Sequence, residues 1–409
     1  MDQPEAATTT LDTTTLEYPF ANPSALEPPA EWSQLRGRCP VARVTLPSGD
    51  EAALITRYDD VKSVLADPRF TRMLDAPDAA RISTTSGGAF AAKTAIPQSG
   101  EGHQHWRRTV ARWFTAKRMR TLLPAIEAMA DRLIDDMLEA GQPADLKAYV
   151  GFPLPVWVIC DLLGVPESDH ALFSHWSDAF LNMTRYSQAE LDAAHAEFDA
   201  YLSVHIAAKR ANPADDLLSE LIAIGDGGDE AFGDDVLIAT GRGLLVAGHE
   251  TTANMIGKMT AALLADRSRW EKLLADPSLV NSAVEEALRF DANPGIGMPR
   301  YITEDAEIGG TPVPRGTTIM CSMAAANRDE SVFDDPDAMD LARTPNAHIA
   351  FGAGAHSCLG QALARTELQA VLRVLLRRLP TLRLAVKPEQ LRRIEGLLVG
   401  GLREVPVGW

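Results

Sequence analysis

The strongest constraint on this sequence is a short glycine-rich segment at residues 351–360, FGAGAHSCLG, which leads into a predicted helix. Its three glycines allow a tightly folded loop and a close approach of the backbone to a flat ligand. Cys358 stands immediately before the helix, where free backbone N–H groups and the helix dipole stabilise a thiolate. A dinucleotide-binding fingerprint is excluded, because GxGxxG needs a third glycine where Ser357 stands. For a lone cysteine, the favoured interpretation of such a segment is an ordinary loop that contains a buried cysteine.

Extended to residue 365, the segment reads FGAGAHSCLGQALAR and resembles the haem-binding loop of the cytochrome P450 family. The resemblance implies that the cofactor is haem b (iron protoporphyrin IX) and that the Cys358 thiolate is the axial ligand of its iron. Such a ligand donates electron density that favours cleavage of the O–O bond. The same resemblance places Phe351, Gly352 and Gly360 among the haem contacts.

A second match lies in a long predicted helix, where residues 247–252 read AGHETT and resemble the family's oxygen-activation segment. The resemblance places Ala247 at the haem and makes Glu250 and Thr251 catalytic residues that pass protons to bound dioxygen. We expect Gly248 to let the helix open locally. Without the resemblance, the segment is a buried helix with one polar turn. A zinc-protease motif is excluded, because HExxH requires a second histidine that is absent.

Four residues match the family's contacts to the haem propionates, namely His103, Arg107, Arg300 and His356. His103 and Arg107 lie one helical turn apart, and an imidazole and a guanidinium suit carboxylate recognition. Without the resemblance each would be interpreted as a surface charge. One departure from the family is the segment at residues 99–102, SGEG, which replaces the acidic-proline dipeptides that usually precede this helix.

Glu286 and Arg289 form an ExxR pair, an acid and a base three residues apart on one predicted helix. As a lone ion pair it would be solvated and would contribute little to stability. In the family this pair ties the core to an arginine of an irregular loop, and Arg343 is the matching candidate. We interpret all three as structural. Met339 stands where this loop usually has phenylalanine.

Periodicity predicts a mainly α protein with a small β portion, organised as a single large domain at residues 16–409 after a disordered, threonine-rich leader at residues 1–15. The resemblance makes this the cytochrome P450 fold. Helical patterns and strand patterns occupy different parts of the chain. We expect a hairpin at 41–55, helices at 103–139 (with a break at Pro124), 145–164, 190–210, 235–266, 277–290 and 359–379, short strands at 296–323 and after 379, and an irregular loop at 327–346.

Charge and composition narrow the class of protein. The chain has 39 Lys and Arg against 56 Asp and Glu, a net charge of −17, which disfavours general nucleic-acid binding. No apolar run approaches the ~20 residues of a membrane span. The four cysteines are scattered, and the first basic residue is Arg36, so neither a disulfide scaffold nor a signal peptide is expected. We therefore expect a soluble, cytoplasmic monomer that uses neither nucleic acid nor a membrane.

The resulting hypothesis is a haem-thiolate monooxygenase that oxidises a small, bulky, apolar organic substrate, such as a specialised metabolite, with O2. Two alternatives remain open: a haem-thiolate enzyme that catalyses oxidative coupling, cyclisation or desaturation, and a non-catalytic haem-binding sensor or carrier. Arg242 either meets a polar group of the substrate or, as the simpler interpretation, faces solvent or pairs with Asp235 or Glu230. By family position the substrate walls include Gly243, Val246, Ala247, Ile296, Gly297, Met298 and Leu398.

The electrons must come from a separate protein, because the chain has no flavin or nicotinamide domain. Basic residues concentrate in two segments, at 102–125 and in the helix that follows Cys358, in a chain that is acidic overall. By the family fold both segments lie on the thiolate side of the haem. A local positive patch selects an acidic partner and speeds its encounter. We therefore predict an acidic ferredoxin, with its reductase, as the electron donor.

Overall fold

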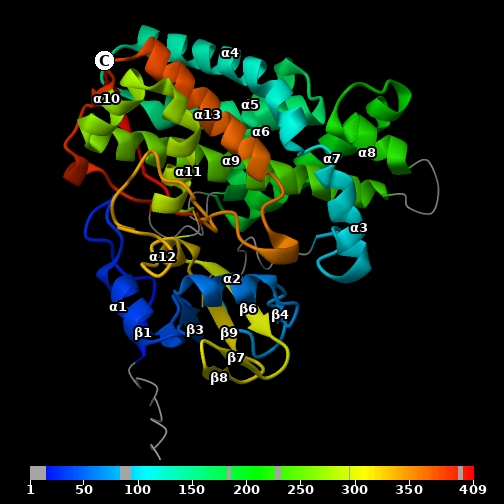
Figure 1. Cartoon of the computed structure of the whole chain (residues 1–409). Helices are drawn as coiled ribbons and strands as arrows, with labels where there is room; N and C mark the ends of the chain where they lie inside the picture. Colours follow the sequence, from blue (N-terminus) through cyan, green and yellow to red (C-terminus); the bar gives the residue numbers. More distant parts are fainter. Residues whose placement is uncertain (1–14, 83–93, 182–185, 226–231, 294, 395–398) are drawn as a thin grey trace, which may run out of the picture.

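The computed structural model describes residues 15–82, 94–181, 186–225, 232–293, 295–394 and 399–409. Its helices gather in one large part, and the main sheet lies with α1 and α2 at the other end of the molecule (Figure 1). The predicted fold class, mainly α with a small β portion, is confirmed. The expected disordered leader lies outside the described residues, apart from Thr15. Within these ranges, no helix combines the length and the apolar character that crossing a membrane requires.

The main sheet has six strands in the order β1-β2-β3-β9-β6-β4. The predicted hairpin is confirmed as the antiparallel pair β2–β3, and β9 lies parallel to β3 on its other side. On β9, Ile319 and Cys321 pack with α2 on one face, whereas Met320 packs with β2 on the other. This alternation follows from the two-residue period of a strand. The strands are β1 (Leu16–Glu17), β2 (Ala42–Thr45), β3 (Glu51–Ile55), β4 (Phe70–Thr71), β6 (Met298–Ile302) and β9 (Thr318–Cys321).

Two smaller sheets complete the β portion. One pairs β7 (Ala306–Ile308) with β8 (Thr311–Val313), and the turn between them is made by two glycines with positive φ. The other joins β10 (Arg383–Leu384), β11 (Pro406–Gly408) and β5 (Ala144–Asp145), which lie far apart in the sequence. The strands predicted at 296–323 and after residue 379 are thereby confirmed.

The long helix α9 (Asp234–Ala265) runs through the helical part. From Thr252 to Leu264 every residue is buried, whereas Gly243 and Ala247 in its first half are exposed. Other helices pack around it because their apolar faces need cover from water. These and the remaining helices are α1 (Ala30–Arg38), α2 (Tyr58–Ala66), α3 (Gly100–Ala111), α4 (Ala116–Ala140), α5 (Pro153–Leu163), α6 (His170–Leu181), α7 (Gln188–Ala211), α8 (Leu217–Gly225), α10 (Arg267–Ala275), α11 (Val280–Phe290), α12 (Met323–Ala326) and α13 (Gln361–Arg378).

The predicted break at Pro124 is wrong, because this proline lies inside α4. The interruption falls instead at residues 112–115, between α3 and α4, where Thr115 caps α4 by accepting a hydrogen bond from the Arg118 N–H. A proline removes one helical hydrogen bond. Here the buried stripe that continues on both sides of it, from Met119 to Met137, outweighs that loss. The helix α1 was not predicted, because Trp32 and Leu35 are its only large apolar residues.

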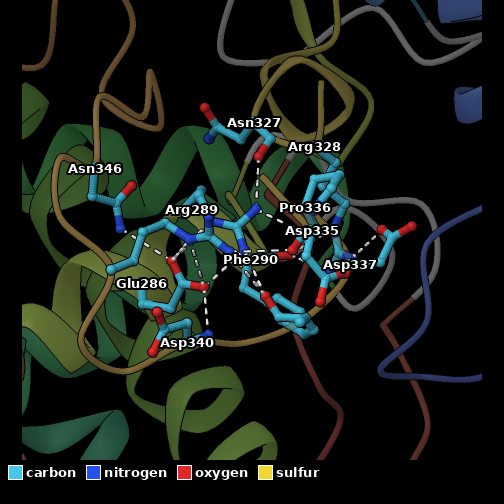
Figure 2. Close-up of polar contacts among 12 residues, drawn as sticks. Glu286, Arg289, Phe290, Asn327, Arg328, Asp335, Pro336, Asp337, Asp340 and Asn346 are labelled. Carbon is cyan, nitrogen blue, oxygen red and sulfur yellow. Dashed lines mark hydrogen bonds and ion pairs between the residues drawn. The ribbon is translucent and has the colours of Figure 1, made fainter. Parts of the chain in front are cut away.

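The ExxR pair fastens the irregular segment that follows α12 to the helical core (Figure 2). Glu286 and Arg289 have no exposed side-chain surface, and two guanidinium nitrogens of Arg289 donate to the two carboxylate oxygens at 2.8 Å. Arg289 also donates to the backbone carbonyls of Asn327, Pro336 and Ala338. Arg343 donates to the Glu286 carboxylate at 3.1 Å. The side chains of Glu286 and Arg289 are therefore not solvated, unlike those of a lone surface ion pair. Their contacts supply the partner and the hydrogen bonds that a buried charge requires.

Candidate functional site

The cysteine loop is closed by a backbone hydrogen bond of 2.7 Å from the Cys358 N–H to the Phe351 carbonyl oxygen. Gly352 and Gly354 adopt positive φ, and a Cβ on Gly354 would lie 2.5 Å from the Cα of Ala66 in α2. Of the described cysteines only Cys358 is exposed, since Cys160 and Cys321 are buried and Cys39 is partly buried. The loop therefore presents one accessible thiol three residues before α13 begins.

The thiol is not converted to a thiolate by the loop alone. The surrounding protein desolvates the sulfur and raises the pKa of Cys358, although one side of the residue is accessible. The Gly360 N–H, Arg107 and Arg365 lower this pKa without reversing the shift. A metal cation deprotonates a coordinating thiol outright. A metal such as haem iron would therefore cause the deprotonation of Cys358 that the start of the helix does not achieve.

A cluster of five basic residues gathers near this loop, and we call it the basic cluster. Its members come from four separate parts of the chain: Arg72, His103, Arg107, Arg300 and His356. The rings of His103 and His356 lie 4.4 Å apart. Desolvation first, and then the four other members, lower the pKa of His356 to about 4. Within the described ranges, no carboxylate forms an ion pair with any member.

This composition fits a ligand with two carboxylates. Arg300 is buried, and within the described residues its guanidinium donates only to the neighbouring Pro299 carbonyl, while Nδ1 of His356 is buried with no hydrogen-bond partner there. Buried cations without counter-ions are unfavourable, so a dianionic group in their midst would remove the repulsion. Haem carries two propionates, and the basic cluster therefore fits it. Arg72 was not among the predicted haem contacts, because no local motif surrounds it in the sequence.

The turn at Thr251 differs from the expectation in one respect. The Thr251 hydroxyl donates to the Ala247 carbonyl at 2.7 Å. Contrary to prediction, α9 does not open at Gly248 and stays α-helical throughout. The glycine serves packing instead, because a Cβ there would lie 2.7 Å from Cδ1 of Ile159 in α5.

Glu250 lies beside this turn in an environment that favours its protonated form. Burial raises the pKa of this carboxyl to about 7, while the Lys147 ammonium and the Asn254 side chain lower it. Lys147 begins a π-helical turn, Lys147–Gly151, and donates to the Leu402 carbonyl at 2.7 Å. A carboxyl with a pKa near the ambient pH can both release and accept protons.

The predicted substrate residues divide into two groups. Gly243 and Ala247 are exposed one turn apart on α9, and Ile96 lies 3.7 Å from where a Gly243 Cβ would stand. Ile296, in contrast, packs into the core against the main sheet. Gly297 serves the backbone turn into β6, because its φ is 85° and a Cβ on it would lie 2.8 Å from the Cys321 carbonyl oxygen.

Three further residues were predicted to line the substrate wall. Val246 and Met298 are partly buried, and Leu398 lies outside the described residues. Arg242 pairs with Asp199 of α7 at 3.2 Å, so the predicted pairing with Asp235 is wrong, and Glu230 lies outside the described residues. The ion pair joins two helices that only the fold brings together.

A surface hollow of about 650 Å³ opens beside Cys358. Three arginines line it, Arg107, Arg120 and Arg365, and no carboxylate is among the lining residues. The prediction of a basic patch formed by residues 102–125 and the helix after Cys358 is partly wrong. Acidic residues of α4 neutralise much of α13, because Arg377 pairs with Asp131 at 2.5 Å and Arg378 pairs with Asp131 and Asp135.

Fold and site together define the class of haem-thiolate proteins: an accessible cysteine before a helix, a basic cluster suited to two propionates, and an acid and an alcohol side by side on a central helix. The family sequence model described as Cytochrome P450 matches residues 263–396. Nocardicin C N-oxygenase of Nocardia uniformis subsp. tsuyamanensis is 42% identical over 400 residues, 97% of this chain and 99% of that protein. Mycinamicin IV hydroxylase/epoxidase of Micromonospora griseorubida is 40% identical, over 96% of this chain and 98% of that protein.

A solved structure agrees with these relatives. That of SgvP, described as a putative thioether synthase involved in the tailoring step of griseoviridin, matches with a TM-score of 0.89 and 39% identity, covering 97% of this chain and 100% of SgvP. The chain belongs to the cytochrome P450 family. It is a cytochrome P450 monooxygenase, and the family implies a haem-iron cofactor. The alternative of a non-catalytic sensor or carrier is thereby excluded.

Proposed function

We propose that this enzyme inserts one oxygen atom of O2 into a small, bulky, apolar specialised metabolite, using two electrons from an acidic ferredoxin and its reductase. In the balanced reaction, substrate, dioxygen, two electrons and two protons give the oxygenated product and water. The observation that carries the proposal is the accessible Cys358 thiol next to a basic cluster that lacks a carboxylate. We further propose that the protein acts as a monomer in the cytoplasm.

The site residues would have two roles, binding haem and delivering protons. Cys358 would ligate the iron of haem b, the basic cluster would hold the propionates, and Phe351, Gly352, Gly360 and Ala247 would contact the ring. When bound, haem supplies an iron centre that activates dioxygen. Thr251 and Glu250 would deliver protons, a role that the raised pKa of Glu250 supports.

The substrate proposal rests on small residues and on the printed activities of relatives. Gly243 and Ala247 are exposed on α9, Ile96 lies 3.7 Å from where a Gly243 Cβ would stand, and Val246 precedes Ala247 in the sequence. Met298 is partly buried and would join this wall by family position. Leu398 would add to this wall. The relatives named above act on nocardicin C and mycinamicin IV, which favours a natural product of comparable bulk.

A second candidate reaction is oxidative coupling, cyclisation or desaturation. The structural similarity to SgvP, a putative thioether synthase, supports this second candidate. Both reactions use the same oxidant and differ in the product. Hydroxylation adds one oxygen atom to the substrate, whereas coupling or desaturation removes two hydrogen atoms, so product mass distinguishes them.

The haem assignment is tested by Cys358→Ser with Cys39→Ser as the matched control. The purified parent should bind one haem, and its reduced carbon monoxide complex should show the red-shifted Soret band of a thiolate ligand. Cys358→Ser should lose this band, because a hydroxyl is a poor ligand for iron, while Cys39→Ser should keep it. Retention of the band in Cys358→Ser would refute the assignment.

A further inference from the structure

The backbone carbonyl of Thr251 receives a hydrogen bond from outside its own helix. The donor is the side-chain amide of Asn293, whose Nδ2 lies 2.6 Å from the Thr251 carbonyl oxygen. Asn293 follows the end of α11 by three residues. In an α-helix the carbonyl of residue i already accepts the N–H of residue i+4, so Asn293 is an additional donor. The Thr251 hydroxyl donates a hydrogen bond to the Ala247 carbonyl, one turn earlier in α9.

Asn293 is held firmly in this place. Its own carbonyl accepts the Gly400 N–H at 2.7 Å. Two residues earlier, the Asp291 carbonyl accepts from the buried Lys258 ammonium at 2.7 Å, and the Asp291 carboxylate pairs with Arg393 at 3.0 Å. Thr251 and Lys258 are seven residues apart and therefore share one face of α9. The segment 291–293 is thus fastened along that face at two points.

One atom of Asn293 is unexplained by this packing. Its Oδ1 is buried, and no described residue forms a hydrogen bond with it. An amide used only to hold the loop would be expected to satisfy both of its ends, because a buried polar atom without a partner is unfavourable. A hydrogen bond from a water molecule or a ligand next to the Thr251 turn would satisfy this oxygen.

We propose that Asn293 is a positioning residue for oxygen activation, which sets the orientation of Thr251 through its backbone carbonyl. A donor that pulls a helical carbonyl outward lengthens the bond to residue i+4 and bends the helix locally. A threonine hydroxyl that donates back to the i−4 carbonyl acts on the same turn. The hydrogen bond from Asn293 to the Thr251 carbonyl and the one from the Thr251 hydroxyl to the Ala247 carbonyl together fix the position of this hydroxyl. The inference rests on the proposed proton-delivering role of Thr251.

The test compares three variants of the haem-loaded enzyme. Asn293→Ala removes the donor, Asn293→Asp replaces it with an isosteric acceptor, and Asn212→Ala, exposed just after α7, is the control of the same residue type. Losing one neutral hydrogen bond should lower product per reducing equivalent by roughly fivefold and raise hydrogen peroxide correspondingly. The substrate dissociation constant should change less than about twofold, because Asn293 acts on Thr251. Asn212→Ala should behave as the parent.

Two further readouts separate positioning from general support of the loop. In Asn293→Asp, coupling should recover as the pH falls and the carboxyl becomes protonated, because a protonated carboxyl can again donate to the Thr251 carbonyl. The C–O stretching band of the reduced carbon monoxide complex should shift in both Asn293→Ala and Thr251→Ala, and not in Asn212→Ala. Adding Asn293→Ala to Thr251→Ala should cause no further loss of coupling.

The outcomes distinguish this inference from the proposed function. If Thr251→Ala uncouples the reaction and neither Asn293 variant does, the inference is wrong and the proposed function stands. If Thr251→Ala leaves coupling unchanged, the proton-delivering role itself is wrong. An equal loss of substrate affinity in Asn293→Ala would make Asn293 a binding residue and overturn the proposal. If Asn293→Ala fails to retain haem, the pH response of the isosteric Asn293→Asp decides alone.

Discussion

Arg107 donates two hydrogen bonds to Ser357, the residue before Cys358: one to its backbone carbonyl at 2.5 Å and one to its hydroxyl at 3.1 Å. Both come from Nη2, and no hydrogen bond joins the other guanidinium nitrogens to a described residue, so these nitrogens can donate to a carboxylate. The contact joins α3 to the cysteine loop across 250 residues of sequence. Arg107 therefore supports the loop directly as well as belonging to the basic cluster.

From this contact we predict that Arg107→Lys accelerates haem loss by roughly tenfold or more, because lysine cannot make the same forked contacts and each charged hydrogen bond contributes about 1.5–3 kcal/mol. Transfer of haem to apomyoglobin measures the rate. The control is Arg108→Lys, which changes an exposed neighbour on the same helix. Equal rates in the two variants would contradict a role for Arg107 in holding the loop.

The packing of Gly248 against Ile159 makes a prediction about stability. Gly248→Ala gains about 1 kcal/mol in helix propensity but overpacks the contact, which typically costs about 1–3 kcal/mol. We expect a net destabilisation in the parent and a smaller or reversed effect in an Ile159→Val background, which removes the Cδ1 that lies 2.7 Å from the added Cβ. Denaturant unfolding of the four proteins in this cycle measures the coupling. Additive effects would argue that Gly248 is needed for something other than packing.

The raised pKa of Glu250 predicts how stability depends on pH. Burial raises the pKa from 4.5 to about 7, so the folded protein binds more protons than the unfolded chain between these values. Stability should therefore fall as the pH rises through this window, by at most about 3 kcal/mol from this group. Glu250→Gln should reduce the difference in unfolding free energy between about pH 5 and about pH 8. An unchanged difference, with the exposed Glu101→Gln as reference, would count against the buried carboxyl.

The unequal pairing of the basic residues predicts where an acidic partner docks. Arg120 is exposed beside the hollow at Cys358 and forms no ion pair with any carboxylate in the described part of the chain, whereas Arg377 is neutralised by Asp131. Arg120→Glu should slow reduction by ferredoxin several-fold, and more at low salt than at high salt, because a surface charge acts within a screening length of about 10 Å. Arg377→Glu should have little effect. Stopped-flow reduction measures both, and equal slowing by the two variants would exclude the hollow as the docking site.

Local patterns gave reliable predictions where a motif is short and its geometry is set by neighbouring residues. The hairpin at 41–55, the long helix around Thr251 and the irregular segment after Asn327 were all predicted, because alternation, helical period and turn residues act over a few positions. Pro124 and Gly248 were interpreted by their usual local effect and behaved differently. In both cases packing against a distant helix outweighed the local preference.

The sequence by itself determined the class of this protein, since the cysteine loop, the acid–alcohol pair and the ExxR pair are each contiguous motifs whose spacing carries their chemistry. Only the tertiary structure decided which isolated residues join them. Arg72 enters the basic cluster, Asn293 reaches the Thr251 carbonyl, and Arg242 and Arg377 form ion pairs with Asp199 and Asp131. These pairs are separated by tens to hundreds of residues, and a hydrogen bond or ion pair depends on distance in space, which no periodicity along the chain encodes.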